Sequence, residues 1–193
     1  MPGDYDYDVF FSYKRHDLTL DWTRRVYKRF EFWLGEELGG RKARIFVDEN
    51  CIETGDNWPQ VLKDALKTSR CMVCVWSPSY FRSSWCVSEW MSFREREKIA
   101  GIASHGLIAP LRFHDGEHFP EDAQSTQWFD VAPYATTLPG FWETARAVDF
   151  EDGLKTFAQE VAQIVRGAPK YRPDWPVVLA AGLPTPLIHL EKL

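Results

Sequence analysis

The sequence contains no long apolar run. No stretch approaches the roughly 20 residues that a helix needs to cross a bilayer, and the longest candidate, 177–183, ends at Pro184. The first residues, Met1 to Asp6, are acidic where a secretory signal is basic. We therefore expect a cytoplasmic protein with no membrane partner.

Positive charge is also scarce. The chain has 23 Lys and Arg residues against 28 Asp and Glu residues, which gives a formal net charge of −5. Proteins that bind nucleic acids usually carry a basic patch or stripe. The charge balance therefore predicts no nucleic-acid partner.

Cysteine is rare, with four residues in 193. Cys71 and Cys74 form a CxxC pair inside an apolar, strand-like run, and neither a second CxxC nor a pair of histidines follows. Zinc sites need such a second pair. We expect buried, reduced cysteines and no bound metal. His114 and His118 stand four apart in a polar stretch, which favours a surface loop over a metal site.

Two kinds of catalytic or phosphate-binding motif are missing. Neither G-x-G-x-x-G nor G-x-x-x-x-G-K-[ST] occurs, so the chain has no Gly-rich phosphate loop. No serine or cysteine lies in a nucleophile-elbow motif. The functional residues must therefore lie elsewhere.

The sequence does contain strand-like runs that alternate with helical patterns. Strands are expected at 7–13, 44–47, 71–76, 107–113 and 145–150. The run at 71–76 is apolar throughout, as in a central parallel strand. Pro110 favours a position near a sheet edge or a strand end for the fourth strand. This alternation predicts an α/β fold with a parallel sheet covered on both faces.

The helices have recognisable starts and ends. One apolar stripe with spacings of three and four precedes Gly39-Gly40 and consists of Leu18, Trp22, Val26, Phe30, Trp33, Leu34 and Leu38. Ser83 or Ser84 is expected to cap a helix that begins near Trp85, and Asp152 to cap the last helix. Residues 114–140 show no clear pattern. We expect a domain over 1–168 and a Pro-rich extension or linker over 169–193.

Polar residues follow the first and third strands. If the strand order is 2-1-3-4-5, the order reverses between these two strands, where open α/β sheets bind ligands. The segments 12–15 and 77–89 then converge on one crevice. Lys14 and Arg15 suit phosphate groups, although on these two residues alone a solvated loop is the better explanation.

Glu89 is the carboxylate of interest in the second segment. It lies in the first turns of a helix between Trp85 and Trp90, and partial desolvation there raises a carboxylate's pKa and basicity. A glutamate that meets the helix dipole is the alternative explanation. We expect its side chain to point to solvent, with little packing at stake.

Three boxes of the sequence carry a family resemblance. They are 7–15, then 46–48 with 52–55 and Trp58, then 77–80 with 83–89. In order and spacing they resemble the first strand, the second strand with its "BB loop", and the glutamate-bearing helix of Toll/interleukin-1 receptor (TIR) domains of the NAD-cleaving, bacterial type. The resemblance covers about residues 5–167.

The resemblance implies a fold and an activity. The implied fold is a flavodoxin-like three-layer sandwich with a five-stranded parallel sheet in the order 2-1-3-4-5. The implied activity is that of an NAD+ nucleosidase, a hydrolase for which NAD+ is the substrate and which needs no cofactor. It releases nicotinamide and forms ADP-ribose or a cyclic ADP-ribose isomer. The implied setting is immune or antiviral signalling, with activation by self-association of TIR domains into a homo-oligomer or filament.

The resemblance also implies site residues. Glu89 is the implied catalytic residue. The implied NAD-binding residues are Ser12, Tyr13, Lys14, Arg15, Asp48, Glu53, Trp58 and Ser84. For Trp58, stacking on a base and anchoring of its helix in the core both stay open.

Two other functions stay open. Some TIR domains are non-catalytic adaptors that only associate with other TIR domains, but an adaptor has no need of Glu89. A nucleoside or nucleotide transferase on a similar sheet also uses a carboxylate at a strand exit.

Overall fold

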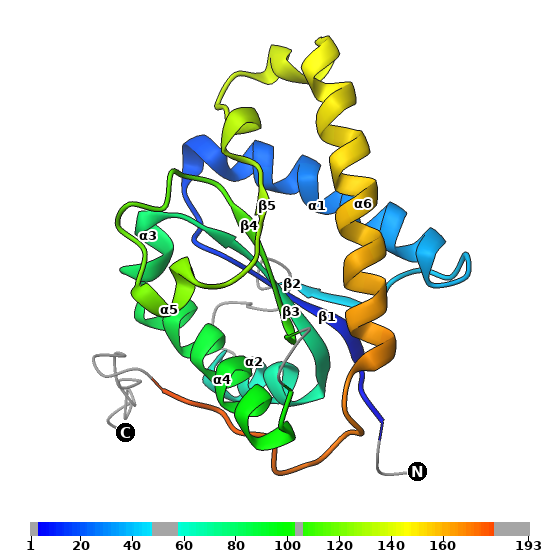
Figure 1. Cartoon of the computed structure of the whole chain (residues 1–193), viewed down its shortest axis with the longest axis vertical. Coiled ribbons are helices and arrows are strands. Elements are labelled where there is room, and N and C mark those ends of the chain that lie inside the picture. The colour runs from blue at the N-terminus through cyan, green and yellow to red at the C-terminus, as the bar shows by residue number, and fades with distance from the viewer. Residues whose placement is uncertain (1–3, 48–57, 103–105, 180–193) are drawn as a thin grey trace, which may run out of the picture.

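The computed structural model of the chain describes residues 4–47, 58–102 and 106–179 (Figure 1). Asp48 and Glu53, two of the residues expected to contact NAD+, lie outside these ranges. Among the described residues, no helix combines the length and the apolarity that crossing a bilayer requires.

Five parallel strands form one sheet in the order β2-β1-β3-β4-β5, which confirms the predicted fold class. The strands are β1 (Tyr7–Tyr13), β2 (Ile45–Val47), β3 (Ser69–Trp76), β4 (Ile108–Arg112) and β5 (Phe129–Asp130). β1 and β3 lie side by side at the centre and are buried almost throughout. Strands covered on both faces are apolar along their whole length rather than at alternate positions.

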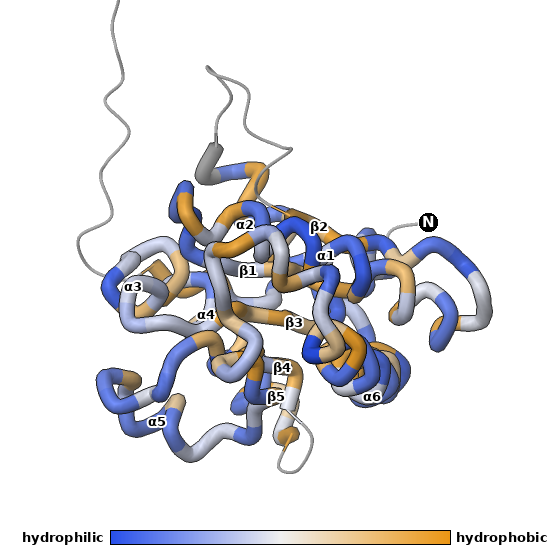
Figure 2. Tube along the Cα trace, turned by 90° about the horizontal axis from the view of Figure 1, so that it is seen from above, coloured by the Kyte–Doolittle hydropathy of each residue, from blue (hydrophilic) through white to orange (hydrophobic). Residues whose placement is uncertain are grey.

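Helices cover both faces of this sheet. They are α1 (Asp17–Glu37), α2 (Trp58–Thr68), α3 (Pro78–Phe81), α4 (Ser84–Ala100), α5 (Glu121–Gln124) and α6 (Ala145–Gly167), with 3-10 turns η2 (Ala132–Tyr134) and η3 (Pro139–Glu143). Seen from above, α1 and α6 lie on one side of the strands, and α2, α3 and α4 lie on the other (Figure 2). The result is a three-layer sandwich.

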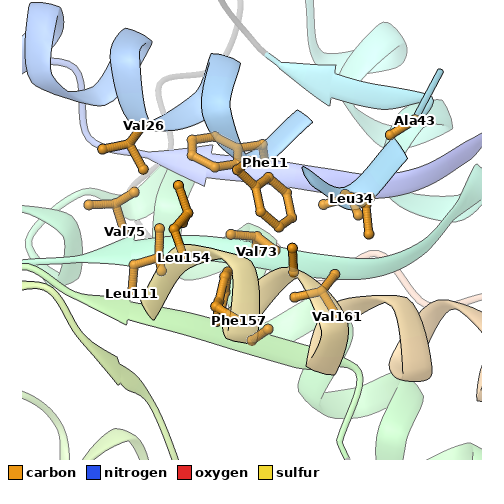
Figure 3. Close-up of a cluster of buried hydrophobic side chains, with 14 of the residues drawn as sticks. Phe11, Val26, Leu34, Ala43, Val73, Val75, Leu111, Leu154, Phe157 and Val161 are labelled. Carbon is orange, nitrogen blue, oxygen red and sulfur yellow. The ribbon is translucent and has the colours of Figure 1, made fainter. Parts of the chain in front are cut away.

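Each face of the sheet has its own apolar core. On the side of α1 and α6, Phe11 and Val73 of the strands meet Leu34 of α1 and Phe157 of α6, as Figure 3 shows. On the other side, Phe10 stacks on Phe46 with ring centroids 5.1 Å apart. Because side chains alternate along a strand, neighbouring residues of β1 serve opposite cores.

The apolar stripe of α1 is confirmed except at its first position. Trp22, Val26, Phe30 and Leu34 are buried, but Leu18 is 66% exposed. Leu18 lies in the first turn, and the stripe enters the core only from Trp22 onward. The helix ends at Glu37, just before Gly39-Gly40, which both adopt positive φ angles (90° and 77°) that favour glycine.

The predicted fifth strand at 145–150 is wrong. These residues form the first turns of α6, and Asp152 lies inside that helix rather than at its cap. Phe150 continues the helical spacing of the buried residues Leu154 and Phe157, so the apolar stripe of α6 begins earlier than expected. The true fifth strand, Phe129–Asp130, lies within the segment that showed no clear pattern. It pairs only with the end of β4, at Leu111 and Arg112.

Pro110 occupies the middle of β4, opposite Cys74 of β3. β5 begins to pair with β4 only one residue later, at Leu111. Proline lacks the N–H that a strand flanked on both sides needs. The prediction of an edge-like environment therefore holds for this part of the strand.

The described part of the C-terminal extension lies against α4. Trp175 is 2% exposed, and its indole N–H donates to the Tyr5 hydroxyl at 3.0 Å. The backbone N–H of Val178 donates to Ser92 Oγ of α4 at 2.9 Å. The guanidinium of Arg96 lies 5.2 Å from the Trp175 ring.

A buried aspartate joins the starts of β1 and β2. Asp8 is fully buried and accepts two hydrogen bonds from the Arg41 guanidinium, at 2.7 and 2.8 Å, and one from the Arg44 backbone N–H at 2.9 Å. Burial alone raises the pKa of Asp8, but the hydrogen bonds outweigh it and hold the pKa below its usual value.

We predict that Asp8→Asn lowers the free energy of unfolding by about 1–3 kcal/mol at neutral pH, because it leaves Arg41 without its carboxylate. A carboxyl whose folded-state pKa is lowered stabilises the fold above its unfolded pKa of about 4 and loses this contribution as the pH falls. Urea unfolding from about pH 7 to pH 3 measures both effects. The control is Asp21→Asn, since the Asp21 side chain is 64% exposed. Equal acid sensitivity of Asp8→Asn and the wild type contradicts the prediction.

Candidate active site

The carboxyl ends of β1 and β3 meet at one edge of the sheet. Ser12 pairs with Cys74, and Tyr13 pairs with Val75. The segments that follow these strands therefore begin next to each other, as the predicted strand order requires. This is the edge at which a ligand site was expected.

The segment after β3 leads into α4 through two serine caps. Ser77 caps α3 and accepts from the backbone N–H of Tyr80 at 3.2 Å. Ser83 then caps α4 and accepts from the backbone N–H of Cys86 at 3.5 Å, which confirms the predicted capping of this helix by one of the two serines. Serine favours this position because its hydroxyl satisfies an N–H that lacks a partner in the helix.

Glu89 lies on the buried face of α4. The other buried residues of this helix are Cys86, Ser88, Trp90, Ser92, Phe93 and Arg96. Glu89 stands three residues after Cys86 and four before Phe93, so all three project from one side of the helix. Its exposed fraction is 5%. The expectation that Glu89 points to solvent is therefore wrong, and its side chain belongs to the packed interior.

Two hydroxyl groups accompany this carboxylate. Ser12 Oγ of β1 donates to Glu89 Oε2 at 2.5 Å. The same Ser12 oxygen lies 2.9 Å from the hydroxyl of Tyr80, which comes from α3. Ser12 is 2% exposed and Tyr80 is fully buried. Residues from three separate elements thus form one buried polar cluster.

The surroundings of this cluster are apolar. Burial raises the pKa of the Tyr80 phenol well above its usual value, and the nearby Cys74, Cys86 and Glu89 add to this effect. Burial likewise raises the pKa of Cys74. The phenol is therefore protonated at neutral pH and retains its hydrogen-bond donor.

The structure brings only some of the predicted site residues together. Ser12 contacts Glu89 directly. Lys14 and Arg15 follow β1 and are exposed, whereas Tyr13 and Ser84 are partly buried. Trp58 begins α2, but its side chain lies outside the described part of the chain, as do Asp48 and Glu53.

Sequence reasoning did not single out Tyr80. A tyrosine after Ser77-Pro78 at a strand exit is most simply explained as a core aromatic, and its ring does pack against Phe81 with centroids 5.3 Å apart. The available signal was the polar Ser12 directly after the apolar residues Val9, Phe10 and Phe11 of β1. A buried hydroxyl on a central strand needs a partner.

The cysteines of the CxxC pair are buried and free, as predicted. Within the described ranges, no three His, Cys, Asp or Glu side chains gather in a way that suits a metal ion.

The family of the chain follows from comparison with known proteins. The family model described as "TIR domain" matches residues 9–165. The chain belongs to the TIR domain family. This assignment agrees with the parallel sheet and with the resemblance of the three sequence boxes.

Among curated TIR relatives, the disease resistance protein RUN1 of Vitis rotundifolia is 31% identical over 114 residues, which is 59% of this chain and 8% of RUN1. The NAD(+) hydrolase TirS of Staphylococcus aureus is 28% identical over 106 residues, which is 55% of this chain and 34% of TirS. The chain matches less than a tenth of the length of the plant relatives.

Among solved structures, the TIR domain of the Toll-related receptor TRR-2 from Hydra magnipapillata is similar to this chain. The match has a TM-score of 0.42 and 22% identity, and it covers 76% of this chain and 98% of the receptor domain.

We predict that Glu89→Ala lowers the free energy of unfolding by about 1–3 kcal/mol, because it removes the acceptor of a buried hydroxyl and leaves a cavity. Glu89→Gln keeps the volume and one acceptor oxygen, so its loss is smaller. Urea unfolding of the two variants and the wild type measures the difference. An alanine variant as stable as the wild type contradicts the buried position of this side chain.

Proposed function

We propose that this TIR domain is an NAD+ nucleosidase with Glu89 as its catalytic residue. The observation that carries the proposal is the buried carboxylate at the shared edge of β1 and β3, held by the Ser12 hydroxyl at 2.5 Å. The similarity to the NAD(+) hydrolase TirS supports the same activity. The proposal places the chain with the NAD-cleaving members of its family.

The chemistry requires one carboxylate. The bond between the ribose C1′ and the nicotinamide nitrogen breaks, and its electron pair leaves with nicotinamide, which departs as a neutral molecule. No general acid is needed for this step. The ribose becomes oxocarbenium-like, as in glycoside cleavage. A fixed negative charge stabilises this cation most in an apolar site that excludes water, such as the surroundings of Glu89.

Two nucleophiles complete the reaction. Attack by water gives ADP-ribose and releases one proton. Attack by a nitrogen of the adenine of the same molecule gives a cyclic ADP-ribose isomer. The proposal covers both products.

Substrate binding is assigned to the segments around this edge. Lys14 and Arg15 are exposed immediately after β1, and their charges suit the two phosphates of NAD+. Tyr13, Asp48, Glu53, Trp58 and Ser84 complete the proposed set of substrate contacts. Ser12, the remaining predicted contact, donates a hydrogen bond to Glu89 itself.

Activation by self-association is part of the proposal. Glu89 is only 5% exposed in the single chain, so contact with a ribose requires a shift of the side chains that cover it. Association with other TIR domains favours such a shift to the extent that these contacts bind the form with an accessible Glu89 more tightly than the closed form. We therefore propose that a single chain cleaves NAD+ slowly until it associates with other TIR domains, and that this activation takes place in immune-type signalling.

We predict that concentrated wild-type protein consumes NAD+ and that Glu89→Gln lowers kcat at least about a hundredfold, because the amide cannot supply the negative charge. Chromatography of the reaction separates nicotinamide, ADP-ribose and cyclic products. The specific activity is expected to rise with protein concentration.

The stability assay described above verifies that Glu89→Gln is folded, so that a loss of activity reports chemistry. Equal activity of wild type and Glu89→Gln removes Glu89 from the reaction. A wild type that consumes no NAD+ at any concentration overturns the enzyme assignment in favour of a non-catalytic adaptor.

We predict that Lys14→Ala or Arg15→Ala raises the KM for NAD+ by about ten- to a hundredfold with little change in kcat, because a charged contact to phosphate contributes about 1.5–3 kcal/mol. Lys28→Ala, which removes another exposed cation on α1, is the control. Steady-state kinetics over a range of NAD+ concentrations measures both parameters. If the KM of Lys14→Ala and Arg15→Ala matches that of the control, these residues do not bind the substrate.

A further inference from the structure

The protons of the buried cluster can be counted. A serine hydroxyl carries one proton and two acceptor lone pairs. Ser12 gives its proton to Glu89 Oε2, so its 2.9 Å contact with Tyr80 must be a bond in which Tyr80 is the donor. The direction of the chain of bonds is therefore Tyr80 to Ser12 to Glu89.

We propose that Tyr80 and Ser12 are positioning residues that hold the Glu89 carboxylate in its reactive orientation and in its ionised form. This inference rests on the proposed function and deepens it. Tyr80 acts through Ser12, and Ser12 acts on Glu89. The inference also changes the role of Ser12, which holds the carboxylate instead of binding NAD+.

The two hydrogen bonds matter for the ionisation of Glu89 because all three groups are buried. An apolar environment disfavours an ionised carboxylate, and a donated hydrogen bond favours it. The Ser12 hydroxyl could otherwise turn toward a different acceptor. By donating to Ser12, Tyr80 occupies one of its lone pairs and leaves the Ser12 proton directed at Glu89.

Tyr80 is itself held firmly. Its backbone N–H donates to the Ser77 carbonyl oxygen at 3.0 Å and lies 3.2 Å from Ser77 Oγ, and its ring contacts Phe81. Its side chain has no exposed surface. A preorganised donor costs no reorientation at the moment of reaction, which is the condition under which a fixed dipole accelerates a reaction.

The reassignment of Ser12 follows from the same count. Its single proton is used by Glu89, and it is 2% exposed. It therefore has no proton to donate to a ribose hydroxyl while the carboxylate is held.

The test is Tyr80→Phe, which keeps the ring and removes only the hydroxyl. We expect kcat for NAD+ cleavage to fall about tenfold with the KM unchanged, as for an interaction that matters only in the transition state. We also expect the acid limb of the kcat profile to move to higher pH, because a hydrogen bond that favours the ionised carboxylate has been weakened.

A double-mutant cycle tests whether Tyr80 acts through Ser12. Ser12→Ala is expected to lower kcat at least as much as Tyr80→Phe. In the Ser12→Ala background, Tyr80→Phe should have no further effect on kcat or on the acid limb. The matched control is Tyr27→Phe, which removes a hydroxyl that donates to Glu31 on α1, away from the site. If the effects of Tyr80→Phe and Ser12→Ala on kcat are independent and additive, Tyr80 does not act through Ser12.

A purely structural role predicts a different result. Tyr80→Phe then lowers the thermal midpoint, but its kcat and its acid limb match those of the wild type, and this outcome overturns the inference.

A wild type that cleaves no NAD+ overturns the proposed function instead. In that case, an NMR titration that follows the side-chain carboxyl carbon of Glu89 against pH tests the effect of Tyr80 on Glu89 without any need for activity. A higher titration midpoint in Tyr80→Phe supports it, and an unchanged midpoint overturns it.

Discussion

The parallel pairing of β1 with β3 determines where every group of the candidate site lies. Ser12 and Glu89 are 77 residues apart in the sequence, and they meet because Ser12 stands opposite Cys74 near the end of β3. Side chains alternate along a strand, so Ser12 shares the face of Phe10, which packs on the side of α2 and α4. A shift of one residue in the register between β1 and β3 would turn Ser12 toward α1 and α6 and separate it from Glu89.

Burial of the carboxylate opposes folding, and the fold offsets this cost locally. The apolar cluster around α4 includes Cys86, Trp90 and Phe93 on the helix and Cys74 on β3. An ionised group in such surroundings is stable only with donors aimed at it. The Ser12 hydroxyl is one donor, and it is itself satisfied by Tyr80. Satisfied hydrogen bonds of this kind let the apolar core hold the polar groups.

Periodicity predicted the parts of the fold with strong local patterns and missed those that depend on tertiary contacts. The α1 stripe and the strands β1 and β3 were predictable. The helix has apolar residues at spacings of three and four, and the two strands contain the apolar runs 9–11 and 71–76. β5 was not predictable, since two residues carry no periodicity. The six residues 145–150 are too short a segment to separate a strand from the start of a helix by pattern alone. The sequence could single out Glu89 as a candidate. To predict that it is buried, its position on the helical face of Phe93 had to be given more weight than its position near the helix start. The partnership with Tyr80 follows only from the strand order.

The same burial serves both reactivity and control under the proposed function. A carboxylate that is 5% exposed has already exchanged water for fixed protein dipoles, so stabilisation of a cationic ribose needs little further reorganisation. The exposed Lys14 and Arg15 stand at the same strand end without this constraint, so phosphate binding is possible before the carboxylate is reached. Access to Glu89, and not its chemistry, is then the step that a neighbouring domain can regulate. Because Ser12 and Tyr80 hold the carboxylate from β1 and α3, a shift that uncovers it need not disturb its orientation.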